Sequence, residues 1–211
     1  MVKDFSKIES SYFLSGIPTI HKDSHLKNFE NKYAKSNAIF WNTLIKLATT
    51  LLEDPKSFPK FVFLCGHPGN GKTHFLVGLY RALIHVLGYS GGDGASFFTF
   101  ASLNAEIIAG FADNVPIRTA MSNYTQSKWL FIDDFTASER ILKANSLEQT
   151  ILRDIILDRF DKGYHMITTC NFSSLDLIHQ MDGLFGNYVV SRINSSNKIV
   201  QFPQGDFRTS K

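Results

Sequence analysis

The chain has few of the features that mark secreted, membrane-bound or disulfide-rich proteins. Its 211 residues include only two cysteines and six prolines, and they contain neither a signal peptide nor a long apolar run. A membrane-spanning helix needs about 20 consecutive apolar residues, and disulfide-dense domains belong to oxidising compartments. The seven histidines show no metal-ligand spacing. We therefore expect a reduced, cytoplasmic location and no contact with a membrane.

The charge balance is also unremarkable. A formal net charge of +3 is too small to indicate nucleic-acid binding by itself. With 44% hydrophobic and 19% charged residues, the composition is that of an ordinary globular protein. The sequence has no internal repeat and no low-complexity tract. We expect one medium-sized domain over residues 16–211, preceded by an N-terminal tail over residues 1–15.

One glycine-rich stretch stands out. The apolar run Phe61–Cys65 is typical of a buried parallel strand. A phosphate-binding pattern, G-x-x-x-x-G-K-[ST], follows it at once. Its residues are Gly66, His67, Pro68, Gly69, Asn70, Gly71, Lys72 and Thr73. Apolar residues then recur on one helical stripe, and Gly88 is a candidate C-cap: Phe75, Leu76, Leu79, Leu83, Val86 and Leu87.

Each part of this pattern suits a nucleoside triphosphate. The glycines allow a tight turn whose N–H groups point at phosphate oxygens, and the helix N-terminus adds partial positive charge. Lys72 can reach the β- and γ-phosphates, and the Thr73 hydroxyl can ligate Mg²⁺. The alternative is a chance match in an ordinary glycine turn. The strand before the pattern and the helix after it favour an ATP·Mg²⁺ site.

Strand and helix signals alternate along the rest of the chain. This alternation predicts an α/β fold with a central parallel sheet flanked by helices on both faces. The expected helices start at Ala38, at Ser102 as N-cap and at Ser146 in a capping box with Gln149, with shorter ones near Ser173 and over Leu184–Ile193. The other expected strands are Ala95–Ala101, Trp129–Asp134, His165–Cys170 and Lys198–Phe202.

Three polar residues follow two of the predicted strands. Ligands of such sheets bind beyond the carboxyl ends of the strands, where we expect Asp133, Asp134 and Asn171. Asp133 suits a Mg²⁺ ligand, and Asp134 suits a residue that orients or activates the attacking water. Asn171 can donate an amide hydrogen bond to the γ-phosphate or to that water. The alternatives are that Asp134 caps a turn and that Asn171 is an ordinary turn residue.

Other side chains admit two interpretations each. Arg192 is either an arginine finger supplied to a neighbouring subunit or a solvated helix residue. Cys65 and Cys170 end strands that we expect to be close together, and we interpret them as small core residues. Residues 112–128 are weakly patterned. There we predict single-stranded DNA binding by Phe111, Arg118, Tyr124 and Lys128, against the alternative of a solvated loop.

Taken together, these motifs resemble the AAA+ ATPases of the DnaC/DnaI helicase-loader and IstB transposition-helper group. The resemblance covers residues 16–211. It is carried by GIPTIHKDSHLKNF, GHPGNGKTH with its trailing His74, LFIDDF, ITTCN, VVSRI and QGDFR. It implies a three-layer P-loop NTPase fold of the AAA+/ASCE type. It also implies that Gly66–Thr73 is Walker A, Asp133 and Asp134 Walker B, Asn171 sensor 1, and Arg192 the trans-acting arginine.

The resemblance further implies an ATPase that oligomerises through its nucleotide face and acts on single-stranded DNA, with a replicative helicase or a transposase as client. We expect hydrolysis to be slow, because aspartate is one methylene shorter than glutamate at position 134, and to be stimulated by assembly. A monomeric P-loop kinase of a small metabolite is the main alternative, and a binding module with structural ATP is another.

Overall fold

The computed structural model describes residues 16–29, 37–87, 94–112, 122–135, 147–173, 181–183, 185–195 and 197–205. Residues 1–15, the helix cap expected at Ser146 and the turn expected at Gly88 lie outside these ranges. The helices are α1 (Ala38–Glu53), α2 (Lys72–Leu87), α3 (Phe100–Ala112), α5 (Ser122–Gln126), α6 (Leu147–Lys162) and α8 (Asn187–Ser195). Short 3-10 turns are η2 (Thr19–His21), η3 (Leu26–Asn28) and η4 (Pro55–Ser57).

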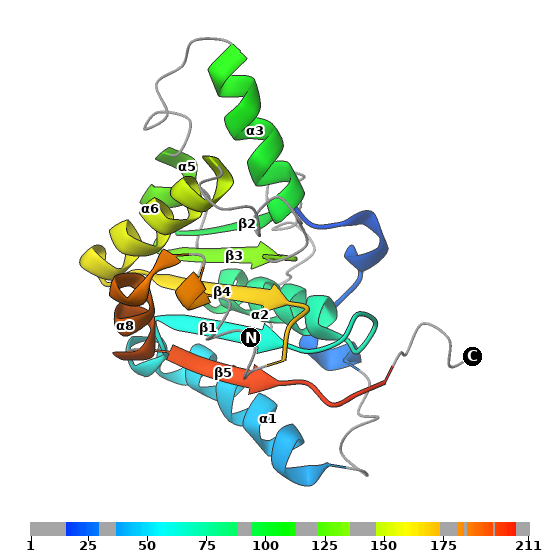
Figure 1. The fold of residues 1–211 in the computed structure, drawn as a ribbon. Helices are drawn as coiled ribbons and strands as arrows, with labels where there is room; N and C mark the ends of the chain where they lie inside the picture. Colours follow the sequence, from blue (N-terminus) through cyan, green and yellow to red (C-terminus); the bar gives the residue numbers. More distant parts are fainter. Residues whose placement is uncertain are drawn as a thin grey trace.

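A parallel sheet forms the middle of the molecule (Figure 1). Its strands are β1 (Phe61–Cys65), β2 (Ala95–Thr99), β3 (Trp129–Asp133), β4 (His165–Cys170) and β5 (Asn197–Gln201). They lie in the order β2-β3-β4-β1-β5, and every adjacent pair is parallel. This order interleaves strands that are distant in the sequence, so the connecting helices must cross over the faces of the sheet.

Helices cover both faces, which confirms the predicted three-layer α/β fold. Every residue of β1 is buried, and its side chains alternate between two hydrophobic clusters. Val62 and Leu64 pack with α1 and α2 on one face. Phe61, Phe63 and Cys65 pack with α3, α5, α6 and α8 on the other. A strand buried on both faces must be apolar throughout, which explains the unbroken run Phe61–Cys65.

Some element boundaries match the prediction, and others differ by one to three residues. The second strand ends at Thr99 rather than at Ala101, and α3 begins at Phe100. The predicted cap at Ser102 was wrong, because the hydroxyl of Thr99 accepts from the Ser102 N–H at 3.1 Å. The Ser102 hydroxyl in turn accepts from the Thr99 N–H at 3.2 Å, which completes a capping box that starts one turn earlier.

Three further elements depart from the predicted bounds. The third strand ends at Asp133, one residue early. The last strand is shifted by one residue to Asn197–Gln201. Helix α8 begins at Asn187 and ends at Ser195, three and two residues after the predicted bounds. Helix α5 was not predicted at all, since its sequence SNYTQ carries no apolar stripe. The region expected to form a helix near Ser173 lies mostly outside the described residues.

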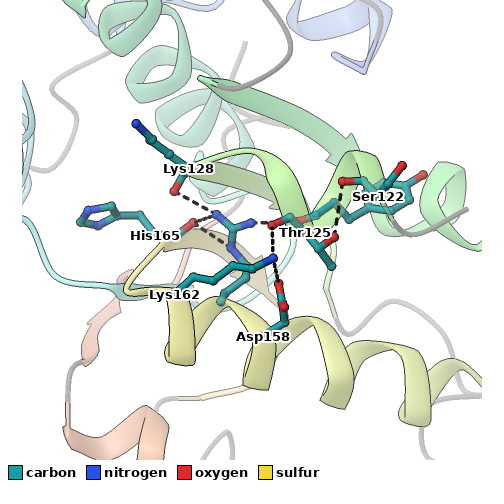
Figure 2. Close-up of polar contacts among 8 residues, drawn as sticks. Ser122, Thr125, Lys128, Asp158, Lys162 and His165 are labelled. Carbon is teal, nitrogen blue, oxygen red and sulfur yellow. Dashed lines mark hydrogen bonds and ion pairs between the residues drawn. The ribbon is translucent and has the colours of Figure 1, made fainter. Parts of the chain in front are cut away.

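A buried arginine joins helices α5 and α6 to the start of β4 and to Lys128 just before β3. Figure 2 shows Lys128 and His165, two of the residues around it. Arg159 of α6 is 0% exposed, and its guanidinium donates to three main-chain carbonyls. One is the carbonyl of Tyr124 in α5 (2.8 Å), one that of Lys128 before β3 (3.0 Å), and one that of His165 at the start of β4 (3.1 Å from Nε). Burial lowers the pKa of Arg159 to about 9. The planar fork of arginine suits this role, since it can satisfy several carbonyls at once.

Candidate functional site

The glycine-rich loop turns sharply between β1 and α2. Gly66, Gly69 and Gly71 have φ angles of 138°, 83° and 89°, which side-chain-bearing residues rarely adopt. Gly66 is also closely packed, because a Cβ atom there would lie 2.6 Å from Asn70 Nδ2 and 3.0 Å from the Phe202 carbonyl oxygen. Helix α2 then begins at Lys72. The loop therefore presents a helix N-terminus at the carboxyl end of β1, as an anion site requires.

Lys72 lies folded against this loop. Its Nζ donates to the carbonyl oxygens of Gly66 (2.6 Å) and His67 (2.7 Å) and to Asn70 Oδ1 (3.1 Å). The side chain is buried, and burial lowers the pKa of its ammonium group. The same ammonium group can exchange these neutral oxygens for charged phosphate oxygens, which form stronger hydrogen bonds.

Two oxygen ligands suited to a magnesium ion meet beside the loop. The Thr73 hydroxyl donates to Asp133 Oδ1 at 2.9 Å, and the Thr169 hydroxyl donates to the same oxygen at 2.6 Å. Burial raises the pKa of the Asp133 carboxyl, and the two hydroxyl donors oppose this rise. Adjacent ligands of an octahedral Mg²⁺ lie about 3 Å apart. The spacing of the Thr73 and Asp133 oxygens therefore fits Mg²⁺.

Asp134 occupies a special backbone position after β3. Its φ angle is 56°, in the left-handed region that aspartate tolerates better than most side chains. The Thr169 hydroxyl accepts from the Asp134 N–H at 2.8 Å, and the Phe135 N–H donates to the Thr169 carbonyl at 2.9 Å. The turn is thus fixed by β4, while the Asp134 side chain is exposed. Such a turn aims a carboxylate away from the strand, and Asp134 lines the cavity described next.

A cavity of about 500 Å³ brings most of the predicted site residues together. The residues of the loop from Pro68 to His74 line it, together with Asp133, Asp134 and Asn171 at the carboxyl ends of β3 and β4. Gly66 and His67 lie at the base of the loop, and the His67 side chain is exposed. Among the described residues, the cavity thus gathers the phosphate loop, two carboxylates and one amide.

The N-terminal segment adds residues that sequence reasoning missed. Pro18, Ile20 and His21 line the same cavity, although they precede the loop by about fifty residues in the sequence. Burial lowers the pKa of His21, and the nearby His74 lowers it further. Ile20 is 87% exposed, an unusual position for an apolar side chain. No local spacing links these residues to the loop, so only tertiary packing reveals them.

Arg192 lies away from this cavity. Its helix, α8, stands where the strands begin, whereas the phosphate loop follows the ends of the strands (Figure 1). The guanidinium stacks 3.5 Å from the centre of the Tyr188 ring, and Nη1 donates to the Tyr188 carbonyl at 3.3 Å. It also lies 5.5 Å from the centre of the Phe160 ring. Arg192 is therefore not brought together with the glycine-rich loop of this chain.

One of the four residues predicted to bind single-stranded DNA is buried. Tyr124 is 0% exposed; its ring packs edge-on against Phe98 at 4.5 Å, and its hydroxyl donates to Glu106. Its expected stacking on bases was therefore wrong. The Lys128 side chain is exposed, so its predicted contact with a phosphate stays a prediction. Arg118 and the side chain of Phe111 lie outside the described residues.

The two cysteines lie side by side, as expected. Cys65 and Cys170 are register partners in adjacent strands, with 3.0 Å between their sulfur atoms, and both are free and fully buried. The hydrogen bond from Cys170 and burial both raise the pKa of the Cys65 thiol. A buried neutral thiol is a poor nucleophile. The structure thus supports their interpretation as small core residues.

Comparisons with known proteins identify the fold. No protein-family model and no curated protein matches the chain. Among solved structures, a DnaC helicase loader is similar with a TM-score of 0.70 and 21% identity, over 88% of this chain and 100% of that one. DnaI is similar with a TM-score of 0.66 and 15% identity, over 90% and 93% of the two chains.

A DnaA replication initiator is also similar. The AMPPCP-bound protein from Aquifex aeolicus has a TM-score of 0.65 and 16% identity, over 89% of this chain and 52% of that one. The present chain thus spans about half the length of that initiator. The structure is an α/β fold with sheet order 2-3-4-1-5, similar over most of its length to the AAA+ domains of helicase loaders and replication initiators. No described helix is long and apolar enough to cross a membrane.

Proposed function

We propose that this chain is an AAA+ ATPase that binds ATP·Mg²⁺, oligomerises and acts in cytoplasmic DNA replication as a helicase-loader-like factor. The observation that carries the proposal is the single cavity lined by the phosphate loop, the Thr73–Asp133 pair, Asp134 and Asn171. Fold similarity alone does not determine function. These side chains, however, bring together groups for phosphate binding, Mg²⁺ binding and activation of the attacking water.

Each residue has a distinct chemical task. Lys72 and the N–H groups at the start of α2 bind the phosphates. Thr73 and Asp133 would hold Mg²⁺, which supplies positive charge against the charge that develops on the phosphates. Asp134 projects from its fixed turn to orient or deprotonate the attacking water. Asn171 donates an amide hydrogen bond to the γ-phosphate or to that water.

The N-terminal segment would contact the nucleoside. Pro18, Ile20 and His21 add to the lining of the same cavity, and the His21 ring lies beside that of His74, with 6.5 Å between their centres. The exposed Ile20 side chain suits the flat face of a base, since burial of apolar surface against a ligand is favourable. In this proposal the phosphate loop binds the triphosphate, and the side chains of the N-terminal segment bind the nucleoside.

The position of Arg192 supports assembly between subunits. The phosphate loop lies at the carboxyl ends of the strands, and Arg192 lies where β5 and β1 begin. A head-to-tail contact would bring this face of one subunit onto the nucleotide face of the next. Arg192 would then leave the Tyr188 ring and act on the neighbour's triphosphate. A monomeric kinase needs no arginine on this remote face, which favours the oligomer.

Single-stranded DNA and a replicative helicase are the proposed partners. One similar initiator structure contains AMPPCP together with single-stranded DNA, at 16% identity and a TM-score of 0.65. The similarity to a DnaC helicase loader suggests a helicase client, and a transposase is the alternative for an IstB-like helper. In this chain the exposed Lys128 side chain remains from the predicted DNA-binding set, together with Phe111 and Arg118.

Measuring the mass in solution tests the proposal. Sedimentation is followed with no nucleotide, with ADP and with a non-hydrolysable ATP analogue, for the parent and for Lys72→Ala. We expect the analogue to increase the mass of the parent only, since the variant loses the cationic phosphate ligand of its loop. A parent that binds ATP, stays monomeric and phosphorylates small metabolites would be a kinase. A parent that binds ATP but neither assembles nor phosphorylates small metabolites would use ATP only as a structural ligand.

A further inference from the structure

The N-terminal segment, residues 16–29, is fastened to one face of the phosphate-loop helix. Three α2 residues, His74, Gly78 and Arg81, share this face because they are separated by four and then three positions. Each contacts the segment, as described below. The contacts place the segment against the helix that follows the phosphate-binding loop.

His74 makes the contact nearest to the loop. Its Nε2 lies 2.9 Å from Asn28 Oδ1 and 3.1 Å from the His25 carbonyl oxygen. The carbonyl can only accept a hydrogen bond, so Nε2 carries the proton. Asn28 is itself oriented, because its Oδ1 accepts from the His25 N–H (2.8 Å) and its Nδ2 donates to the Asp23 carbonyl (2.7 Å). His74 therefore donates into a prearranged pair of acceptors.

The next two positions along α2 add close packing and a second polar contact. A Cβ atom at Gly78 would lie 2.9 Å from the Leu26 nitrogen and 3.2 Å from the His25 carbonyl carbon, so the backbones touch there. Arg81 donates to the Lys22 carbonyl. The Phe29 ring also packs edge-on against the His74 imidazole, with 5.3 Å between centres. The segment is thus docked along about two turns of α2.

We propose that His74 is a positioning residue that links the phosphate loop to the N-terminal segment lining the same cavity. This inference rests on the proposed ATP binding. His74 directly follows the magnesium ligand Thr73, while the segment it holds supplies Pro18, Ile20 and His21 to the cavity. Its imidazole joins the element that binds phosphates to the element that faces the nucleoside. His74 thus acts through the segment rather than as a phosphate ligand.

Binding of two different ligands distinguishes the proposed positioning role of His74 from a role as a phosphate ligand. In the proposed binding mode, ATP with Mg²⁺ contacts both the phosphate loop and the N-terminal segment, whereas inorganic tripolyphosphate with Mg²⁺ has no nucleoside to contact the segment. Asn28→Ala removes the nearer of the two acceptors of His74 Nε2, and Asn28 is not among the residues that line the cavity. We expect Asn28→Ala to weaken ATP binding about threefold to tenfold, the range for one hydrogen bond, and to leave tripolyphosphate binding unchanged. Calorimetric titration measures both affinities.

A double-mutant cycle isolates the link. His74→Ala and Asn28→Ala should each weaken ATP binding, and the double variant should bind no more weakly than the weaker single variant. His74→Gln should restore most of the affinity, since its amide can place a donor near the position of Nε2. His85→Ala, which removes an exposed histidine eleven positions further along α2, is the matched control and should bind ATP as the parent does.

Hydrogen exchange adds a readout that needs no nucleotide. His74→Ala and Asn28→Ala should speed exchange at the His25 amide, with no change in α6. Fully additive losses, or unchanged ATP affinity in Asn28→Ala, would overturn the link. Equal losses of ATP and tripolyphosphate binding in His74→Ala would instead make His74 a phosphate ligand. A parent that binds neither ligand would overturn the proposed function itself.

Discussion

The hydroxyl of Thr73 donates to Asp133 Oδ1 across 2.9 Å, which joins the first turn of α2 to the end of β3. The two oxygen atoms already have the spacing of adjacent Mg²⁺ ligands. Thr73→Ala should weaken the apparent Mg²⁺ affinity of the ATP complex at least about tenfold, while Thr73→Ser should retain it. The measurement is ATP binding titrated with Mg²⁺ and repeated with EDTA. Equal Mg²⁺ dependence in Thr73→Ala and the parent would remove Thr73 from the metal site.

Asp134→Asn should separate binding from turnover. Asparagine tolerates the left-handed φ of 56° at this position, so the turn is preserved. An amide cannot accept a proton from water, and loss of a general base typically costs about a hundredfold or more in rate. We expect ATP affinity within about twofold of the parent and a correspondingly lower steady-state rate. Hydrolysis at the parent rate would assign Asp134 to turn formation alone.

Arg159→Ala should destabilise the fold strongly. It leaves the carbonyls of Tyr124, Lys128 and His165 without their shared donor and opens a cavity (Figure 2). A cost of about 3 kcal/mol or more in the free energy of unfolding follows. The matched control is Arg153→Ala, on the same helix, whose side chain is 46% exposed and contacts the adjacent Asp154. Urea titration should place the control within about 0.5 kcal/mol of the parent.

His165 should make the fold sensitive to acid. Its Nδ1 donates to the Pro59 carbonyl (3.1 Å), its Nε2 faces Lys60 Nζ (3.2 Å), and its ring stacks on Trp129. Burial lowers the pKa of His165 from 6.5 to about 4. The unfolded chain therefore binds more protons between these values, so stability is complete above pH 6.5 and falls as the pH drops toward 4.

The loss from this one group is about 3 kcal/mol at pH 4. Asp133 has the opposite slope, because a raised carboxyl pKa favours the folded state in acid, and His21 adds to the slope of His165. Both remain in a His165→Gln variant, so the difference between parent and variant isolates His165. Urea titrations at pH 7 and pH 4.5 measure it. A variant that loses as much stability as the parent between these values would contradict the assignment.

The local parts of this molecule were predictable, and the tertiary parts were not. The apolar run Phe61–Cys65 and the glycine pattern after it are local sequence signals. The strand, the loop and the following helix could therefore be predicted from the spacing of apolar and glycine residues. The predicted cap of α3 was wrong for a local reason. Thr99 and Ser102 both carry a hydroxyl that can cap a helix, and the residue at which β2 ends determines which of them does so.

The other failures concern contacts between distant segments. Tyr124 sits in a polar stretch, and only the packing of Phe98 and the Glu106 acceptor show that it is buried. From the sequence, Arg159 cannot be distinguished from a solvated charged residue on an amphipathic helix. Only the fold brings three main-chain carbonyls within hydrogen-bond distance of its guanidinium. The docking of residues 16–29 depends on backbone contact at Gly78, which no periodicity encodes.

The last prediction concerns Arg192, which decides between an assembly and a solitary enzyme. An arginine finger stabilises charge on the transferred phosphoryl group, and its loss costs about a thousandfold or more in rate. Because Arg192 lies on the face opposite its own loop, it contributes only when a neighbour is docked. Activity per subunit should therefore rise with protein concentration, and Arg192→Ala should flatten that rise with ATP affinity nearly intact. Arg153→Ala is the matched control and should follow the parent.

Mixing two inactive variants makes the test specific. An Arg192→Ala subunit keeps a complete nucleotide cavity, and a Lys72→Ala subunit keeps its arginine. Neither should hydrolyse ATP well alone, yet an equimolar mixture should recover part of the activity, because some interfaces pair an intact cavity with an intact arginine. Sedimentation of the same mixture confirms that the two variants assemble. If they do assemble without recovery, or if Arg192→Ala matches the parent at every concentration, Arg192 is an ordinary helix residue stacked on Tyr188, and assembly must serve some purpose other than completing the site.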